Sequence, residues 1–161
     1  MATSHYKPVG GVVGVRLYPA NAVESAVFEE GQCEVVFSEE GVEVELIDDA
    51  SVYEERVENE QGVLLVEHRL TLVAERNRGQ LWLSGAWQDR VATEGAVAVV
   101  ELCDGRVLLV GYSPLFGAEQ TLHLDSLLVS SGKRLLDTPS ITLTLVSYDT
   151  GLSCEITTNH L

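Results

Sequence analysis

Cysteine is scarce in this sequence of 161 residues, which contains only Cys33, Cys103 and Cys154. Their number is odd, their spacing is wide and no C-x-x-C pair is present, so the pattern does not indicate a disulfide framework. Reduced cysteines fit a protein that is made in the cytoplasm. We therefore expect a fold held together by a packed core rather than by covalent links.

Basic residues are also scarce. Ten Lys and Arg face 25 Asp and Glu, which gives a formal net charge of −15. A protein that binds a nucleic-acid backbone needs clustered Lys and Arg to release counterions, and a protein that binds an anionic lipid surface needs basic clusters as well. The charge balance of this chain argues against both kinds of partner. The acids are concentrated: between Glu24 and Glu60 there are 14 of them and one base, Arg56. This segment is interpreted either as a solvated acidic face or as a surface that repels anions.

Long apolar runs are missing. No stretch approaches the roughly 20 residues that span a bilayer. Residues 9–15 contain three glycines and run into Arg16, which makes a poor signal-peptide core despite the Ala-Asn-Ala triplet that follows at 20–22. We expect a soluble protein with no membrane partner. At 45% hydrophobic, 161 residues are enough for one domain with a substantial core.

No catalytic or metal-binding constellation is evident, and we predict no enzymatic activity, no cofactor and no metal site. Gly111-Tyr112-Ser113 lacks the second glycine of a serine-nucleophile elbow and runs into Pro114. The turn at 131–134 fails the phosphate-loop pattern at its first glycine and its last hydroxyl. The four histidines are far apart, and His68 lies on the apolar face of a long strand, which favours a packed or interface residue over a ligand.

Alternation of apolar and polar residues predicts a mostly β protein. In the segment 42–47, Val42, Val44 and Leu46 share one face, while Glu43 and Glu45 share the other. The stretch 21–30 fits a short helix or a loop. The ranges expected as strands are 12–18, 33–38, 42–47, 52–58, 63–75, 96–103, 106–112, 121–130 and 140–148, with 152–157 as a further candidate.

Two turns define hairpins. Asp104-Gly105 between two β-rich segments is a strong hairpin signal, because both turn positions favour positive φ. Gly62 is expected to join 52–58 to the unusually long strand 63–75 in a hairpin that projects past the body of the domain. Residues 1–11 are expected to be an extended arm.

One helix is predicted over 80–91, where Leu83, Trp87 and Val91 fall at i, i+4 and i+8 and Gly95 closes the region. Trp82 and Trp87 are expected to pack against the core. Only one side of this helix is apolar, so it should lie on a sheet. The fold class is therefore an antiparallel β-sandwich or barrel with one flanking helix and a long hairpin.

The order of these patterns, roughly over residues 50–150, resembles the structural tail proteins of tailed bacteriophages and prophages, in particular tail-tube proteins. The resemblance is carried by the long hairpin leading into Glu75-Arg76-Asn77-Arg78, the Trp-containing helix, the Asp104-Gly105 hairpin, Leu109-Val110-Gly111-Tyr112-Ser113, the Phe116-Gly117 loop and Ile141-Thr142-Leu143-Thr144-Leu145.

The resemblance implies a virion protein, assembled in the host cytoplasm, that forms stacked hexameric rings with other tail proteins as partners. By that analogy, Glu43 and Glu45 face the lumen, and the like-charged wall holds passing DNA off rather than binding it. The inter-ring hairpin would make its contacts through Val52, Tyr53, Val57, Val63 and Leu65. Because a charge of −15 repeated six times is strongly self-repulsive, assembly must rely on apolar contacts, strand pairing or bound cations.

Three other classes remain open from the sequence. One is a different virion component, such as a tail terminator, a connector or a capsid decoration protein. Another is a carbohydrate- or ligand-binding β module, which should have a cleft with exposed aromatics, although aromatics are only 6% of this chain. An enzyme is the third.

Overall fold

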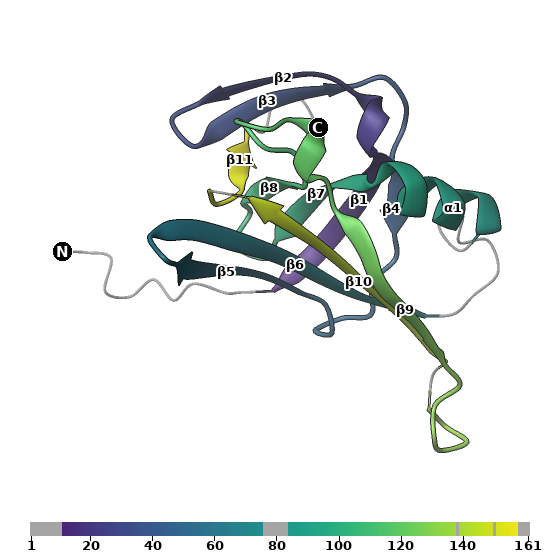
Figure 1. The fold of residues 1–161 in the computed structure, drawn as a ribbon. Helices are drawn as coiled ribbons and strands as arrows, with labels where there is room; N and C mark the ends of the chain where they lie inside the picture. Colours follow the sequence, from purple (N-terminus) through teal and green to yellow (C-terminus); the bar gives the residue numbers. More distant parts are fainter. Residues whose placement is uncertain (1–10, 76–83, 138, 150, 158–161) are drawn as a thin grey trace, which may run out of the picture.

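Two β-sheets stacked on each other form the body of the protein (Figure 1). The computed structural model describes residues 11–75, 84–137, 139–149 and 151–157. Two predicted features lie outside these ranges: the extended arm, apart from Gly11, and the start of the helix at 80–83, which includes Trp82. The described part is mostly strand with one α-helix, as the sequence predicts.

The first sheet has seven strands in the order β2-β3-β11-β8-β7-β1-β4. All neighbours are antiparallel except β3 and β11, which run parallel. The bounds are β1 Val12–Pro19, β2 Val23–Glu29, β3 Gln32–Phe37, β4 Val42–Val44, β7 Ala96–Leu102, β8 Val107–Val110 and β11 Cys154–Ile156.

The second sheet has four antiparallel strands in the order β5-β6-β10-β9. The bounds are β5 Val52–Glu60, β6 Val63–Glu75, β9 His123–Ser130 and β10 Ser140–Asp149. The expected hairpin between β5 and β6 forms, with Glu60 opposite Val63 across the turn. Gly62 has φ +87° there, a conformation that glycine adopts without strain.

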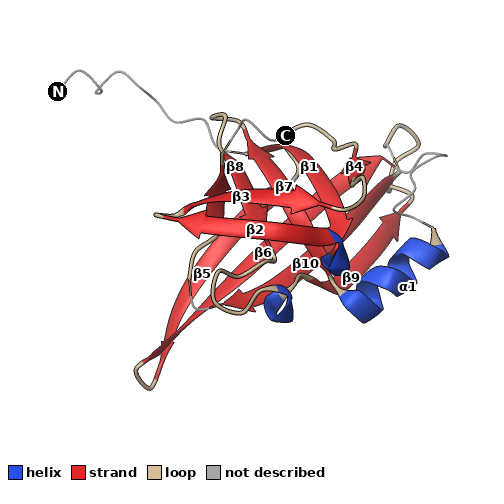
Figure 2. Ribbon diagram, turned by 90° about the horizontal axis from the view of Figure 1, so that it is seen from above, coloured by secondary structure: helices blue, strands red, loops and turns tan. Residues whose placement is uncertain are grey.

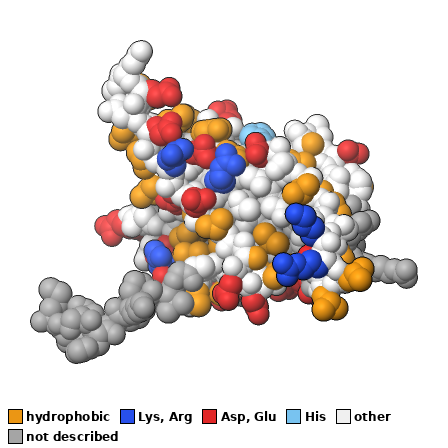
Figure 3. Space-filling view, turned by 90° about the horizontal axis from the view of Figure 1, so that it is seen from below, with side chains coloured by type: hydrophobic (Ala, Val, Ile, Leu, Met, Phe, Trp, Pro, Cys, Tyr) orange, Lys and Arg blue, Asp and Glu red, His pale blue; other side chains and the backbone are white. Residues whose placement is uncertain are grey.

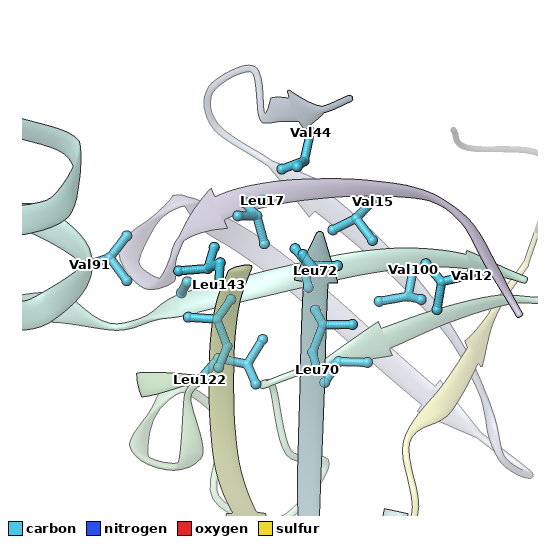
Figure 4. Packing of buried hydrophobic residues seen from close by; sticks show 14 of the residues in the cluster. Val12, Val15, Leu17, Val44, Leu70, Leu72, Val91, Val100, Leu122 and Leu143 are labelled. Carbon is cyan, nitrogen blue, oxygen red and sulfur yellow. The ribbon is translucent and has the colours of Figure 1, made fainter. Parts of the chain in front are cut away.

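The main core lies between the sheets, where apolar side chains from their facing sides interlock (Figure 4). Leu17, Val44 and Val100 come from the seven-stranded sheet, and Leu70 and Leu143 come from the four-stranded one. Period-2 alternation places these residues on one face of each strand. Burial of this apolar surface is the main stabilising contribution to the fold.

A second, smaller core covers the opposite face of the seven-stranded sheet. The β2–β3 pair curls over β11, β8 and β7 (Figure 1), so that Cys33 and Val35 pack against Val97, Val99 and Leu109. Strand β7 is therefore apolar on both faces, and its residues 96–100 are all buried. This double burial explains why its sequence is a continuous apolar run rather than an alternating one.

The two sheets approach each other at two corners without closing into a barrel. Leu46 forms an antiparallel bridge with Ala74, and Ala96 forms one with Leu122. Apart from these bridges, β2, β4, β5 and β9 end their sheets within the described residues. The architecture is an open sandwich.

Helix α1, Gly85–Glu94, begins and ends later than the predicted 80–91. Its first turn is capped by the side chain of Ser84, which accepts a hydrogen bond from the Trp87 backbone N–H. Gly95 ends it with φ +81°. Only Val91 is fully buried among its residues, so the helix lies on the side of the sandwich, as Figure 2 shows.

Two sequence interpretations need correction. The segment 21–30 forms neither an α-helix nor a loop: a short 3-10 turn at 20–22 leads into strand β2. The segment 42–47 is shorter as a strand than expected and pairs with β1, far from β3 in the order of the sheet. Both outcomes depend on partners that are distant in sequence, which local periodicity does not reveal.

Candidate functional site

Glu43 and Glu45 lie on the exposed side of the chain at and just after β4, while Val44 between them is buried. The predicted alternation is therefore confirmed. Glu43 lies opposite Arg16 on β1, and Glu43 Oε2 is 3.9 Å from Arg16 Nη2. Both side chains are exposed, so this ion pair contributes little to stability. The carboxylates are available to whatever surrounds the edge of the sheet.

The β5–β6 hairpin is exposed toward its turn and buried toward its base. Val57 and Val63, near the turn, are 53% and 64% exposed. Val52 is also largely exposed, whereas Leu65 is half-buried. In Figure 2 the turn of this hairpin lies beyond the other strands. All five predicted hairpin residues thus keep part of their surface exposed, and Tyr53 falls in the same half-buried class as Leu65.

Tyr53 directs its hydroxyl into a buried polar cluster that the sequence analysis did not find. The hydroxyl oxygen is 2.7 Å from Glu55 Oε1 and 2.7 Å from His68 Nδ1. Burial raises the pKa of the Tyr53 phenol above its usual value. The sequence signal was the i, i+2 spacing of Tyr53 and Glu55 opposite His68, which places all three on one face of a paired hairpin.

The chain that follows β10 completes the cluster. His68 Nε2 lies 2.9 Å from the carbonyl oxygen of Gly151, and the Ser153 backbone N–H donates to Glu55 Oε1 over 3.1 Å. The Ser153 hydroxyl donates to the same oxygen. The prediction that His68 is a packed residue is confirmed, because it is 3% exposed.

Each polar group of the cluster has a partner. The Tyr53 hydroxyl donates to Glu55 Oε1, and because a carbonyl oxygen only accepts, His68 Nε2 carries a hydrogen toward Gly151. These hydrogen bonds compensate for the removal of the polar groups from water.

The cluster has the residue types of a serine hydrolase but not its geometry. In a catalytic triad the histidine accepts the serine proton. Here the Ser153 hydroxyl donates to Glu55, and His68 is turned to Tyr53 and Gly151. The side chain of His68 is also closed off from solvent. The arrangement fastens the base of the hairpin to the chain after β10.

Ser113 flanks a turn, where it bridges to Gly117. Its hydroxyl donates to Asp149 Oδ1 over 3.0 Å and accepts from the backbone N–H groups of Leu115 and Phe116. The side chain is buried. These bonds satisfy the turn and leave no free nucleophile at this position.

Three of the four strands at the ends of the sheets carry exposed apolar side chains. Val27 lies on β2, Val57 on β5, and Leu128 and Val129 on β9. Strand edges of this kind offer both unpaired backbone groups and apolar surface to a neighbouring chain.

An open pocket of about 480 Å³ lies on the side of the seven-stranded sheet that faces away from the four-stranded sheet. Its apolar lining is formed mainly by Tyr18, Val35, Phe37, Val99 and Val107. The rings of Tyr18 and Phe37 stack with their centroids 3.6 Å apart. Each ring therefore covers a face of the other, which is unlike the open aromatic platform of a sugar site. We call this the outer pocket.

Within the described ranges, no group of three or more His, Cys, Asp or Glu side chains is arranged to hold a metal ion. No helix in the same ranges is long and apolar enough to cross a membrane.

The fold defines the class of the protein as an open, sandwich-like β domain with one flanking helix. Comparisons of the chain with protein-family models, with curated proteins and with solved structures found no match.

Proposed function

We propose that this protein is a structural subunit that assembles with copies of itself. The observation that carries the proposal is the open sandwich: three of the four strands that end the sheets, β2, β5 and β9, have a strand partner on one side only and carry exposed apolar side chains. The free backbone groups of such an edge strand can pair with an edge strand of another copy, and the exposed apolar side chains can be buried against a complementary patch.

The specific form that we propose is a tail-tube-like subunit of a phage-type virion, assembled as stacked hexameric rings. The support is the resemblance of residues 50–150 together with the architecture that it implied: a β-sandwich, one flanking helix and a long hairpin. Exposed Val57 and Val63 near the hairpin turn suit contacts with the next ring.

The net charge of −15 suits a conduit for DNA. A like-charged, hydrated wall repels a polyanion and lets it slide, whereas a basic wall would hold it. Glu43 and Glu45 are candidates for that wall because both are exposed on the same side of the chain.

Sedimentation and negative-stain microscopy of the purified full chain test self-assembly. We expect rings or tubes whose population grows with protein concentration. The double variant Val57→Lys/Val63→Lys should abolish stacking, because it places charges in the proposed inter-ring contact. The matched control is Val36→Lys, since Val36 is an exposed valine on the inner strand β3. A wild-type protein that stays monomeric at all concentrations, with or without Ca²⁺, would overturn the proposal.

DNA retention on assembled particles tests the acidic wall. Particles of the wild-type protein should not retain duplex DNA at low salt. Particles of Glu45→Lys, which leaves the Arg16–Glu43 ion pair in place, should form and retain it, with retention that falls as salt rises. Equal retention by the variant and the wild type would exclude Glu45 from the DNA path.

A further inference from the structure

The loop between β9 and β10 carries the most exposed apolar side chains of the described residues. Leu135 and Leu136 are 104% and 98% exposed. They directly follow Lys133 and Arg134, an adjacent pair of bases in a strongly acidic chain. Figure 3 shows basic and hydrophobic side chains close together toward the end of the molecule where this loop lies in Figure 1.

Residues 132–137 of this loop are held together by hydrogen bonds of their own. Asp137 Oδ2 accepts from the backbone N–H groups of Lys133 and Arg134 over 2.9 and 2.8 Å, and these bonds hold the pKa of Asp137 below its usual value. Gly132 has φ +82°, and a Cβ at that position would lie 2.5 Å from Asp137 Cβ. The loop therefore presents its two leucines without a large ordering cost.

The outer pocket has complementary chemistry. Its interior is apolar, with Val99 and Val107 among its lining residues, and its charged lining residues are Arg16, Glu43 and Glu101. Arg16 and Glu43 form an ion pair, so their charges offset each other and the net negative charge of the pocket comes from Glu101. A pocket of about 480 Å³ is in the size range of sites that enclose a small group.

The loop and the outer pocket belong to different sides of the molecule. The loop connects two strands of the four-stranded sheet, and the pocket lies on the face of the other sheet that is turned away from it. A contact between them therefore joins two copies head to tail. Contacts of this type form rings where the rotation closes and filaments where it does not.

We propose that the β9–β10 loop of one copy docks in the outer pocket of a second copy, with Leu135 and Leu136 buried and with Lys133 and Arg134 beside Glu101. This inference rests on the proposed self-assembly and names one contact that produces it. It also places Glu43 at the rim of an interface and leaves Glu45 as the candidate for the lumen.

A second copy of this chain suits the loop better than an anionic lipid surface. Each base near such a surface contributes only a weak attraction. Two bases do not outweigh the repulsion of a chain with a net charge of −15. In the pocket, by contrast, the two bases meet a local carboxylate and the leucines meet apolar walls.

Sedimentation of the full-length protein tests the apolar part of the contact. Leu135→Ser/Leu136→Ser should weaken self-association at least tenfold, with an unchanged circular dichroism spectrum. The matched control is Leu115→Ser/Leu152→Ser, because these leucines are exposed elsewhere on the surface. Equal association of the first variant and the wild type would overturn the docking proposal and leave self-assembly through the sheet edges intact.

A charge exchange tests the register of the contact. Lys133→Glu/Arg134→Glu and Glu101→Lys should each assemble poorly alone, because like charges then meet. An equimolar mixture should recover association, since the acidic loop of one variant fits the basic pocket of the other. A mixture that associates no better than its components would overturn the pairing of the loop with Glu101.

Vesicles of phosphatidylserine and phosphatidylcholine provide the competing outcome. We expect no binding of the wild-type protein at physiological salt. Binding that is lost in Leu135→Ser/Leu136→Ser would reassign the loop to a lipid surface and overturn the docking of two copies. A monomeric wild type would instead overturn the proposed self-assembly itself.

Discussion

Glu55 and His68 lie directly opposite each other on the paired strands β5 and β6, with Glu55 Oε1 3.9 Å from His68 Nδ1. The Tyr53 hydroxyl lies within hydrogen-bonding distance of both groups. The base of the exposed hairpin is thus held by a polar contact rather than by apolar packing alone.

Removal of the Tyr53 hydroxyl should destabilise the fold. Tyr53→Phe leaves Glu55 and His68 without their shared partner in a buried site, which costs about 1–3 kcal/mol. Urea unfolding of the purified protein measures this loss. Tyr148→Phe is the control, because Tyr148 is an exposed tyrosine on β10. Equal losses for the two variants would show that the hydroxyl of Tyr53 makes no net contribution.

Gly95→Ala should be strongly destabilising, whereas Gly85→Ala should not. Gly95 has φ +81° and ψ 179°, and a Cβ there would lie 2.1 Å from Thr121 Oγ1. The backbone strain alone costs about 1–3 kcal/mol, and the clash adds to it. A Cβ on Gly85 meets nothing within 4 Å at the start of the same helix. Thermal unfolding compares the two variants, and similar melting temperatures would refute the prediction.

Truncation of two leucines on β6 should distinguish the buried body of this strand from its exposed end near the turn. Leu72 is fully buried between the sheets, while Leu64 on the same strand is 53% exposed. Leu72→Ala should cost about 2–5 kcal/mol, because it leaves a cavity in the core. Leu64→Ala should change the free energy of unfolding by about 0.5 kcal/mol or less. A small loss for Leu72→Ala would mean that the two sheets repack easily around it.

Stability should fall in alkaline solution, with Cys33 as one cause. Burial, with a smaller contribution from nearby Cys154, raises the pKa of the Cys33 thiol from 9.0 to about 12. Above about pH 9 the unfolded chain loses this proton while the folded chain keeps it, so rising pH favours unfolding by at most about 1.4 kcal/mol per pH unit.

Denaturant unfolding of the reduced protein between pH 8 and pH 11 measures this slope. Cys33→Ala should give a shallower decline than the wild type, whatever its effect on stability at pH 8. Cys103→Ala, at an exposed cysteine, should keep the wild-type slope. Parallel curves for all three proteins would contradict the assignment. Burial also raises the pKa values of Cys154 and Tyr18, which accounts for the decline that remains in Cys33→Ala.

Local patterns were informative where one strand face is buried and the next turn is short. The alternation of residues 63–75 and the Asp104-Gly105 pair predicted two hairpins that the structure contains. Local patterns were uninformative for β2. This segment has mixed, largely exposed side chains, and it is a strand because it pairs with β3. The buried polar cluster was missed because Ser153 lies 98 residues from Glu55.

The sequence by itself determined the β class, the hairpins, the presence of a helix around residues 85–91 and the strongly acidic character, because periodicity, turn chemistry and charge are properties of neighbouring residues. Tertiary structure decided which strands lie at the sheet edges and which face of the seven-stranded sheet forms the outer pocket. It also decided that Leu135 and Leu136 are exposed to solvent. These features depend on strand order and on the stacking of two sheets, which bring together residues that are far apart along the chain.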